Sequence, residues 1–404
     1  MQFKISYLFI ILLFLALSCK SNKTSDNSAQ EIKEIDTIEA EIIVGAERTS
    51  EYLSLIRNKN VALLVNHTSL VKNTHLVDTL WSLGIKLKII FAPEHGFRGN
   101  EERGISYDNG FDSKTGLPII SLIGKNKMPS AKDLVDIDVL IYDLQDVGVR
   151  FYTYISSMYY LMQACANNNK KLIILDRPNP NGDYVDGPIL DIVNFRSFVG
   201  MLPIPVVYGM TAGELAQMIN GENWLNGNKK CDLTIIKNEN YNHSKHYSLP
   251  VKPSPNLPND ISIRLYPSLC FFEATTFSVG RGTDFPFQVV GYPDDRFGYF
   301  TFVPRDIAGV QTNPIQEGQT CYGIDLQNED LSHKFTLKYF LDFYALCGND
   351  IELISNNRWF DLLMGTDKTR KQIVEGKTET QIKNSWQKEL TDFKNKREKY
   401  LLYD

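Results

Sequence analysis

Residues that can carry acid–base chemistry recur in this chain immediately after short apolar runs. Four groups stand in such positions: Asn66 and His67 after residues 61–65, Glu94 and His95 after 87–91, Asp143, Gln145 and Asp146 after 139–142, and Asp176, Arg177 and Asn179 after 172–175. Carboxyl groups and imidazoles placed together can transfer protons. They can also hold a divalent metal ion, but the histidines lack the i, i+4 spacing of a helical metal site. We therefore expect acid–base chemistry without a metal, and metal chemistry is the alternative.

The elements that must position these groups alternate along the chain. Strands are expected over 61–65, 87–91, 119–122, 139–142, 172–175, 204–208 and 233–236, and helices over 75–83, 132–135, 151–167 and 212–220. The last helix begins with the capping-box pattern Thr211-Ala-Gly-Glu214. The expected strands are continuously apolar, which is typical of parallel strands covered by helices on both faces. The pattern predicts a Rossmann-like, doubly wound α/β domain whose ligand binds beyond the carboxyl ends of the strands.

The later part of the chain has a different pattern. Pro253, Pro255 and Pro258 mark a junction, and strands and helices mix after it. Apolar residues spaced along 378–403 predict an amphipathic helix that packs against this second region. We expect a catalytic domain over 42–255 and a smaller α+β auxiliary domain over 256–404, which suits a chain of 404 residues.

Composition and missing motifs exclude several classes of protein. Lysine and arginine total 43 against 48 aspartates and glutamates, so there is no basic surplus for a nucleic-acid partner. The sequence contains no G-x-G-x-x-G, P-loop, G-x-S-x-G, H-E-x-x-H or C-x-x-C pattern. Nucleotide-binding, serine-hydrolase and zinc-ribbon interpretations therefore lose support, and no cofactor is expected.

The first residues predict export rather than structure. Lys4 precedes an apolar run over 7–17, which is too short to span a bilayer but suits a signal peptide. Ala16-Leu17-Ser18-Cys19 resembles a bacterial lipobox, in which the cysteine is acylated and becomes the first mature residue. We expect a signal peptide over 1–18, a polar tether over 19–41 and a lipid anchor on Cys19 at a bacterial membrane. The alternative is an ordinary secretory signal cleaved near Ser18.

Seven longer motifs carry a family resemblance. They are APEHGFRG (92–99), YDLQDVGVRFYTYISSM (142–158), LDRPNPNG (175–182), GPIL (187–190), VYGMTAGELA (207–216), PSPNLP (253–258) and FFEATTFSVGRGTDFPFQVVG (271–291). In this order they resemble the NamZ-type exo-β-N-acetylmuramidases, once a family of unknown function. The resemblance implies a Rossmann-like domain with a smaller auxiliary domain, a cleft between them, and no metal. It also implies release of N-acetylmuramic acid from the non-reducing end of peptidoglycan fragments.

Glycoside hydrolysis usually needs two carboxyl groups, and these can be assigned to candidates. Glu94, in the E-H-G motif, is the expected general acid or acid/base. Glu273 and Asp146 are equal candidates for the second carboxyl group, with Asp176 behind them. For each, a structural ion pair or a capping role is the alternative.

Further residues are expected to bind the substrate. His67, His95, Asn66, Asp176 and Asn179 lie at the strand ends and can orient a carboxyl group or contact the sugar. A guanidinium suits the lactyl carboxylate of muramic acid, and Arg177 and Arg281 are the candidates. Tyr152 is expected to stack on a sugar face, although core packing is the alternative for any aromatic residue here.

Two other functions remain open from the sequence. One is a metal-dependent hydrolase of another cell-wall bond, and the other is a lipoprotein that binds cell-wall sugars without catalysis. Release of free N-acetylmuramic acid from a muramyl glycoside would distinguish the expected muramidase from both of these alternatives.

Overall fold

A seven-stranded sheet forms the centre of the first half of the chain in the computed structural model, which describes residues 40–94, 96–97 and 110–404. The strands, in spatial order, are β5 (Gly110–Phe111), β6 (Pro118–Ser121), β4 (Lys86–Ala92), β1 (Asn60–Val65), β7 (Val139–Asp143), β8 (Lys171–Leu175) and β9 (Asp232–Ile236). Every neighbouring pair is parallel except β5 with β6. A two-stranded hairpin, β2 (Leu70–Val71) and β3 (Thr74–His75), follows β1.

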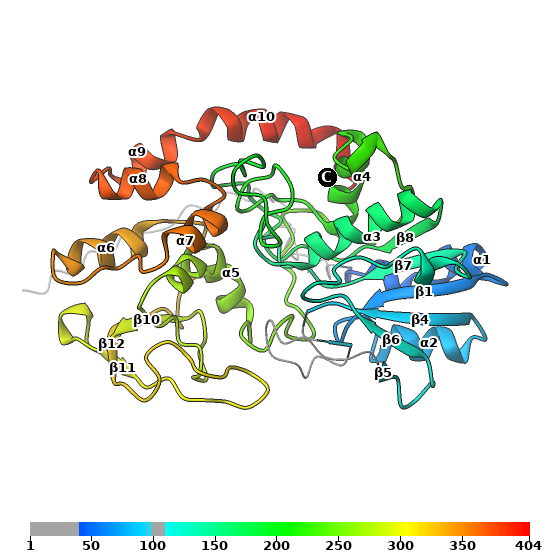
Figure 1. Cartoon of the computed structure of the whole chain (residues 1–404), viewed down its shortest axis with the longest axis horizontal. Coiled ribbons are helices and arrows are strands. Elements are labelled where there is room, and N and C mark those ends of the chain that lie inside the picture. Colours follow the sequence, from blue (N-terminus) through cyan, green and yellow to red (C-terminus); the bar gives the residue numbers. More distant parts are fainter. Residues whose placement is uncertain (1–39, 95, 98–109) are drawn as a thin grey trace, which may run out of the picture. The chain divides into compact units, whose positions relative to one another are not determined.

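Both faces of this sheet are covered by helices. Val61, Leu63 and Val65 of β1 pack in one core cluster with residues of α1 (Thr49–Ile56) and α2 (Leu76–Ser82). Ala62 and Leu64 point to the other face and pack with α3 (Tyr154–Asn168) and α4 (Ala212–Gly221). Figure 1 shows α3 and α2 on opposite sides of the strands. The prediction of a doubly wound, mostly parallel sheet is confirmed, because continuous apolar runs belong to strands buried on both faces.

The chain order creates a switch point in the sheet. β1 continues into α2 on one face, whereas its neighbour β7 continues into α3 on the other. Open α/β sheets bind ligands at the carboxyl ends of the strands that flank such a point.

The second half contains a smaller antiparallel sheet and several helices, as the predicted α+β domain requires. The sheet has the order β10 (Val289–Tyr292), β12 (Cys321–Asp325) and β11 (Phe300–Phe302). The helices are α5 (Asp260–Leu269), α6 (Lys338–Cys347), α7 (Asn357–Met364), α8 (Lys368–Val374), α9 (Glu379–Asn384) and α10 (Gln387–Arg397). Within the described residues, no helix combines the length and apolar character needed to cross a bilayer.

Arg150 ties the two halves together. Its side chain is fully buried, and its guanidinium donates to the main-chain oxygens of Pro188 at 2.7 Å and Ile204 at 2.8 Å. It also donates to the oxygen of Leu363 in α7 at 3.0 Å. A methyl group on Gly365 would lie 2.6 Å from this guanidinium, and Gly365 also has a φ of +77°. The residue after α7 must therefore stay a glycine for the halves to meet in this way.

Three sequence predictions of elements are wrong. Residues 204–208 are buried but form no strand, because Pro205 lacks an N–H for a ladder and Val207 makes only isolated bridges. The C-terminal amphipathic helix is interrupted, so α9 and α10 replace one helix. The break falls at Trp386, whose buried ring packs against Phe335. The expected helix over 132–135 is a short 3-10 turn.

Candidate active site

A narrow hollow, partly open to solvent, lies at the end of β4. The first half of the chain contributes Glu94 and the segment Phe151, Tyr152, Thr153 and Tyr154. The rest of the wall comes from Ser254, Asn256 and Leu257 at the junction and from Tyr266, Arg281 and Phe287 beyond it. We call this hollow the Glu94 pocket. Both halves of the chain therefore build one site.

Glu94 stands two residues beyond the end of β4 and is half-buried. The Thr153 hydroxyl, just before α3, donates to Glu94 Oε2 at 2.8 Å. The Tyr154 hydroxyl lies 3.5 Å from the main-chain oxygen of Glu94 and accepts a 2.7 Å hydrogen bond from Asn66 Nδ2. The ends of β1 and β4 and the start of α3 thus hold the carboxyl group jointly.

Asn66 supports the wall of the pocket from behind. It is fully buried, and its Oδ1 accepts hydrogen bonds from the Thr68 N–H at 2.9 Å and the Thr68 hydroxyl at 2.6 Å. With its Nδ2 bonded to Tyr154, both ends of the amide are occupied. The structure therefore places Asn66 behind the tyrosine, where it positions other residues.

Tyr152 lines the pocket but is nearly buried. Its hydroxyl donates to the Pro253 oxygen at 2.7 Å, and its ring packs edge-on against Tyr154 and Tyr266. The ring helps to fix the junction segment over the site, and stacking on a sugar stays a prediction.

Arg281 and Glu273 form an ion pair at the far wall. Arg281 lines the Glu94 pocket, and its Nη2 donates to Glu273 Oε1. Its Nη1 donates to Gln311 Oε1 at 3.0 Å, whereas its buried Nε has no hydrogen-bond partner. Arg281 thus has one buried donor without a hydrogen-bond partner, and its side chain lines the same pocket as Glu94.

Asp146 is not part of the pocket wall. Its Oδ2 accepts from the Gly148 N–H at 2.7 Å and from the Tyr208 hydroxyl, while its buried Oδ1 has no partner. Burial raises the pKa of Asp146 to about 6, against the lowering effect of these hydrogen bonds. The structure does not bring Asp146 together with Glu94 in the pocket.

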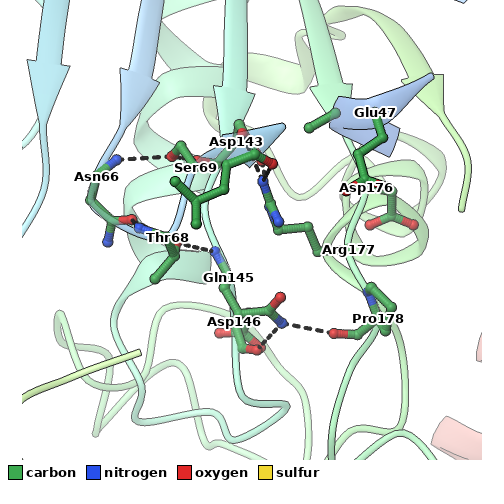
Figure 2. Close-up of polar contacts among 12 residues, drawn as sticks. Glu47, Asn66, Thr68, Ser69, Asp143, Gln145, Asp146, Asp176, Arg177 and Pro178 are labelled. Carbon is green, nitrogen blue, oxygen red and sulfur yellow. Dashed lines mark hydrogen bonds and ion pairs between the residues drawn. The ribbon is translucent and has the colours of Figure 1, made fainter. Parts of the chain in front are cut away.

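Arg177 forms an ion pair with a buried carboxylate. Its Nε and Nη2 donate to Asp143 at 2.6 Å and 3.0 Å, and Nη2 also donates to the Leu70 oxygen at 2.9 Å. Figure 2 shows the guanidinium reaching back to Asp143 at the end of β7. Of the two arginine candidates for the lactyl group, the structure places only Arg281 in the pocket wall.

Asp176 caps the start of α4. It is fully buried, and it accepts from the Thr211 hydroxyl at 2.6 Å, the Gly213 N–H at 2.8 Å and the Tyr403 hydroxyl at 2.7 Å. Burial raises its pKa to about 6. Asp176 therefore has three partners within the fold and does not line the Glu94 pocket.

Asn179 holds a turn. Its Nδ2 donates to the Met210 oxygen at 2.9 Å, and its Oδ1 accepts from the Asn181 N–H at 2.8 Å. It lies close against Gly148, whose φ is +76°. Asn179 lines a separate hollow with His243 and Arg264, so it is not brought to the Glu94 pocket.

His67 contacts the junction segment. Its Nε2 lies 2.9 Å from the Lys252 oxygen, and burial lowers its pKa. His95 and Cys19 lie outside the described residues, so their roles stay predictions. In the described part of the chain, no group of three or more His, Cys, Asp or Glu residues is arranged to hold a metal ion.

Sequence reasoning gave no role in the site to several residues of the pocket wall. Thr153, Asn256 and Phe287 lie inside motifs that carried the resemblance, so their positions were marked but their roles were not. Tyr266 lies in α5 outside any motif, and only its spacing as an apolar helix position could have indicated burial.

Comparisons with known proteins agree on one family. The N-terminal model of exo-β-N-acetylmuramidase NamZ matches residues 61–261, and the C-terminal model matches 264–403. The peptidoglycan β-N-acetylmuramidase NamZ of Bacillus subtilis (strain 168) is 36% identical over 376 residues, which cover 87% of this chain and 89% of the relative.

Two crystal structures of DUF1343 family proteins from Bacteroides fragilis NCTC 9343 have the same fold. One is 47% identical with a TM-score of 0.83, and the other is 28% identical with a TM-score of 0.78. Each match covers 90% of this chain and 99% of the solved one.

Proposed function

Because this chain belongs to the NamZ family of exo-β-N-acetylmuramidases, we propose that its reaction takes place in the Glu94 pocket. The protein is a glycoside hydrolase that releases N-acetylmuramic acid from the non-reducing end of peptidoglycan fragments. The residue roles given below are our proposal, and the pocket geometry supports them.

Glu94 is the general acid. The observation that carries this role is its carboxyl group in a hollow built by both halves, with Thr153 fixing one carboxyl oxygen. A general acid must donate a proton to the glycosidic oxygen as the bond breaks, so its carboxyl group must be held at the bond. Among the described residues of the pocket wall, Glu94 is the carboxylic one, whereas Asp146 and Asp176 form hydrogen bonds elsewhere in the fold.

Glu273 remains the candidate for the second carboxyl group. It is ion-paired with Arg281, which itself lines the pocket, so a small rearrangement of that pair would bring its carboxylate to the site. In the present arrangement it orients Arg281.

Arg281 recognises the lactyl carboxylate that distinguishes muramic acid from N-acetylglucosamine. Its unpartnered buried Nε supplies a donor, and a buried charge-assisted hydrogen bond favours an anionic substituent. Arg177 does not line the Glu94 pocket, and Asp143 and Leu70 accept the hydrogen bonds of its Nε and Nη2.

The decisive experiment replaces the acid and keeps its shape. Purified Glu94→Gln protein is incubated with the disaccharide N-acetylmuramyl-β-1,4-N-acetylglucosamine, and free N-acetylmuramic acid is measured by chromatography. We expect a loss of at least a thousandfold in rate with unchanged circular dichroism. The exposed Glu51 of α1 gives the control Glu51→Gln, which should retain full activity. Near-normal turnover by Glu94→Gln would remove Glu94 from the mechanism.

We also propose that the protein is exported and anchored through lipid on Cys19. The apolar run over 7–17 and the Ala16-Leu17-Ser18-Cys19 motif support this, with the polar segment over 20–41 as the tether. Expression in a bacterial host with a radiolabelled fatty acid should label the wild type and not Cys19→Ser. A labelled Cys19→Ser protein, or an unlabelled wild type, would contradict the proposal.

A further inference from the structure

Arg281 lines a second hollow in addition to the Glu94 pocket. This hollow has about 910 Å³ of empty space, is open to solvent, and has Glu273 and Trp359 in its wall. We call it the Trp359 hollow. Since one side chain borders both spaces, the two hollows adjoin at Arg281.

A second link joins the walls of the two hollows. Asn256 lines the Glu94 pocket, and its Nδ2 donates at 3.1 Å to the main-chain oxygen of Val310, which lines the Trp359 hollow. Arg281 Nη1 contacts Gln311 of the same loop at 3.0 Å. These two hydrogen bonds therefore fix the loop that borders the Trp359 hollow to residues of the Glu94 pocket.

Among the described residues that line the Trp359 hollow, the charges balance. Glu273 and Arg281 form an ion pair with each other. Around them stand the uncharged polar residues Gln311, Thr312 and Asn313. A lining of amides and hydroxyls without surplus charge suits a neutral polyhydroxylated ligand, since a charged peptide would leave its own charges without partners.

Trp359 supplies an aromatic wall on a rigid element. It is half-buried in the first turn of α7, and its main-chain N–H donates at 3.0 Å to the side-chain oxygen of Asn356, which caps the helix. The Asn356 N–H donates to the Ala274 oxygen at 3.0 Å, so the helix start is fixed to the turn that carries Glu273. An indole carried by a helix whose start is fixed in this way suits contact with the C–H face of a sugar ring.

We propose that the Trp359 hollow is the subsite for the leaving-group sugar, a neutral N-acetylated hexose joined to the muramyl unit. Trp359 stacks on that sugar, and the amides beside it bind its hydroxyl and acetamido groups. The inference rests on the proposed function, because it needs the muramyl unit to occupy the Glu94 pocket. It adds the place and the chemistry of the second ring.

The test compares two substrates that share the muramyl unit and differ in the leaving group. One is the muramyl–N-acetylglucosamine disaccharide, and the other is β-N-acetylmuramyl fluoride, whose leaving group is a single atom. Trp359→Ala should lower kcat/KM for the disaccharide about tenfold, the size of one aromatic stacking contact. It should leave kcat/KM for the fluoride within about twofold. Released N-acetylmuramic acid and fluoride ion are the respective readouts.

Two further variants keep the comparison interpretable. Trp359→Phe retains a ring and should recover at least half of the disaccharide activity. The exposed Trp81 of α2 gives the matched control Trp81→Ala, which should affect neither substrate.

The possible failures are distinguishable from one another. Equal loss on both substrates would assign Trp359 to the fold alone and overturn the subsite, as would no loss on the disaccharide. A wild-type protein that cleaves neither substrate would instead overturn the proposed function.

Discussion

The Thr153 hydroxyl donates a 2.8 Å hydrogen bond to Glu94 Oε2, so the residue that precedes α3 fixes the carboxyl group presented by β4. The two residues are 59 positions apart in sequence, and the parallel sheet brings them together. A carboxyl group with one oxygen held in this way has fewer orientations to lose when the substrate arrives.

Removing this hydrogen bond should slow the reaction without loosening substrate binding. Thr153→Val keeps the shape of the side chain and removes the donor, so we expect kcat to fall about tenfold while KM changes less than twofold. Steady-state kinetics on the muramyl disaccharide measure both. Thr153→Ser restores the hydroxyl and should recover most of the rate. A Thr153→Ser variant as slow as Thr153→Val would show that packing, rather than the hydrogen bond, matters.

Loss of Arg281 should change which sugar is preferred. Arg281→Ala removes the proposed partner of the lactyl carboxylate, and a charge-assisted hydrogen bond of about 1.5–3 kcal/mol corresponds to about tenfold to a hundredfold. The ratio of kcat/KM between muramyl and N-acetylglucosaminyl glycosides should fall by that factor. The variant is compared with Arg281→Lys, because Arg281→Ala alone leaves the Glu273 carboxylate without its cation and a lysine keeps one there. An unchanged ratio would mean that another group recognises the lactyl substituent.

Loss of Arg177 should act on stability. Arg177→Met leaves the fully buried Asp143 carboxylate uncompensated, which costs about 3–5 kcal/mol of unfolding free energy. Urea denaturation followed by fluorescence measures this. Adding Asp143→Leu removes the orphaned charge and should recover much of the loss. If Arg177→Met reduces the unfolding free energy by less than 1 kcal/mol, the pair does not support the fold.

The buried aspartates should make stability depend on pH. Burial raises the pKa of Asp146 from 3.8 to about 6, so its stabilising contribution is complete below about pH 4 and is lost as pH rises through 6. A difference of about two pKa units corresponds to about 3 kcal/mol. Asp146→Asn cannot ionise, so the decline of its unfolding free energy from pH 4 to pH 7 should be smaller by about this amount. Identical pH profiles for variant and wild type would contradict the prediction.

The central strands could be predicted because each is buried on both faces. β1, β7 and β8 are nearly continuous apolar runs, and β4 becomes one from Ile89 onward, so their signal does not depend on distant partners. The segment 204–208 is equally apolar but forms no strand. Pro205 has no N–H to donate to a neighbouring strand, and the Ile204 oxygen accepts a hydrogen bond from Arg150. Only the folded arrangement reveals that competing partner.

The site could be predicted in part for a similar reason. Glu94 belongs to a strand end, and sheet topology alone places it at the functional edge. Asp176 and Asp146 instead form hydrogen bonds away from the Glu94 pocket, because the hydroxyl groups of Tyr403 and Tyr208 reach them from far along the chain. Sequence spacing gives no signal for such partners.

The contact of Tyr403 with Asp176 affects when the chain can finish folding. Tyr403 donates to Asp176 and accepts from the Asn238 N–H, and the Leu402 N–H donates to Glu214 of α4. Synthesis proceeds from the N-terminus, so the buried Asp176 carboxyl group obtains its Tyr403 donor only after residue 403 has been made. A chain that ends at residue 255 therefore lacks this hydrogen bond and the one from the Leu402 N–H to Glu214.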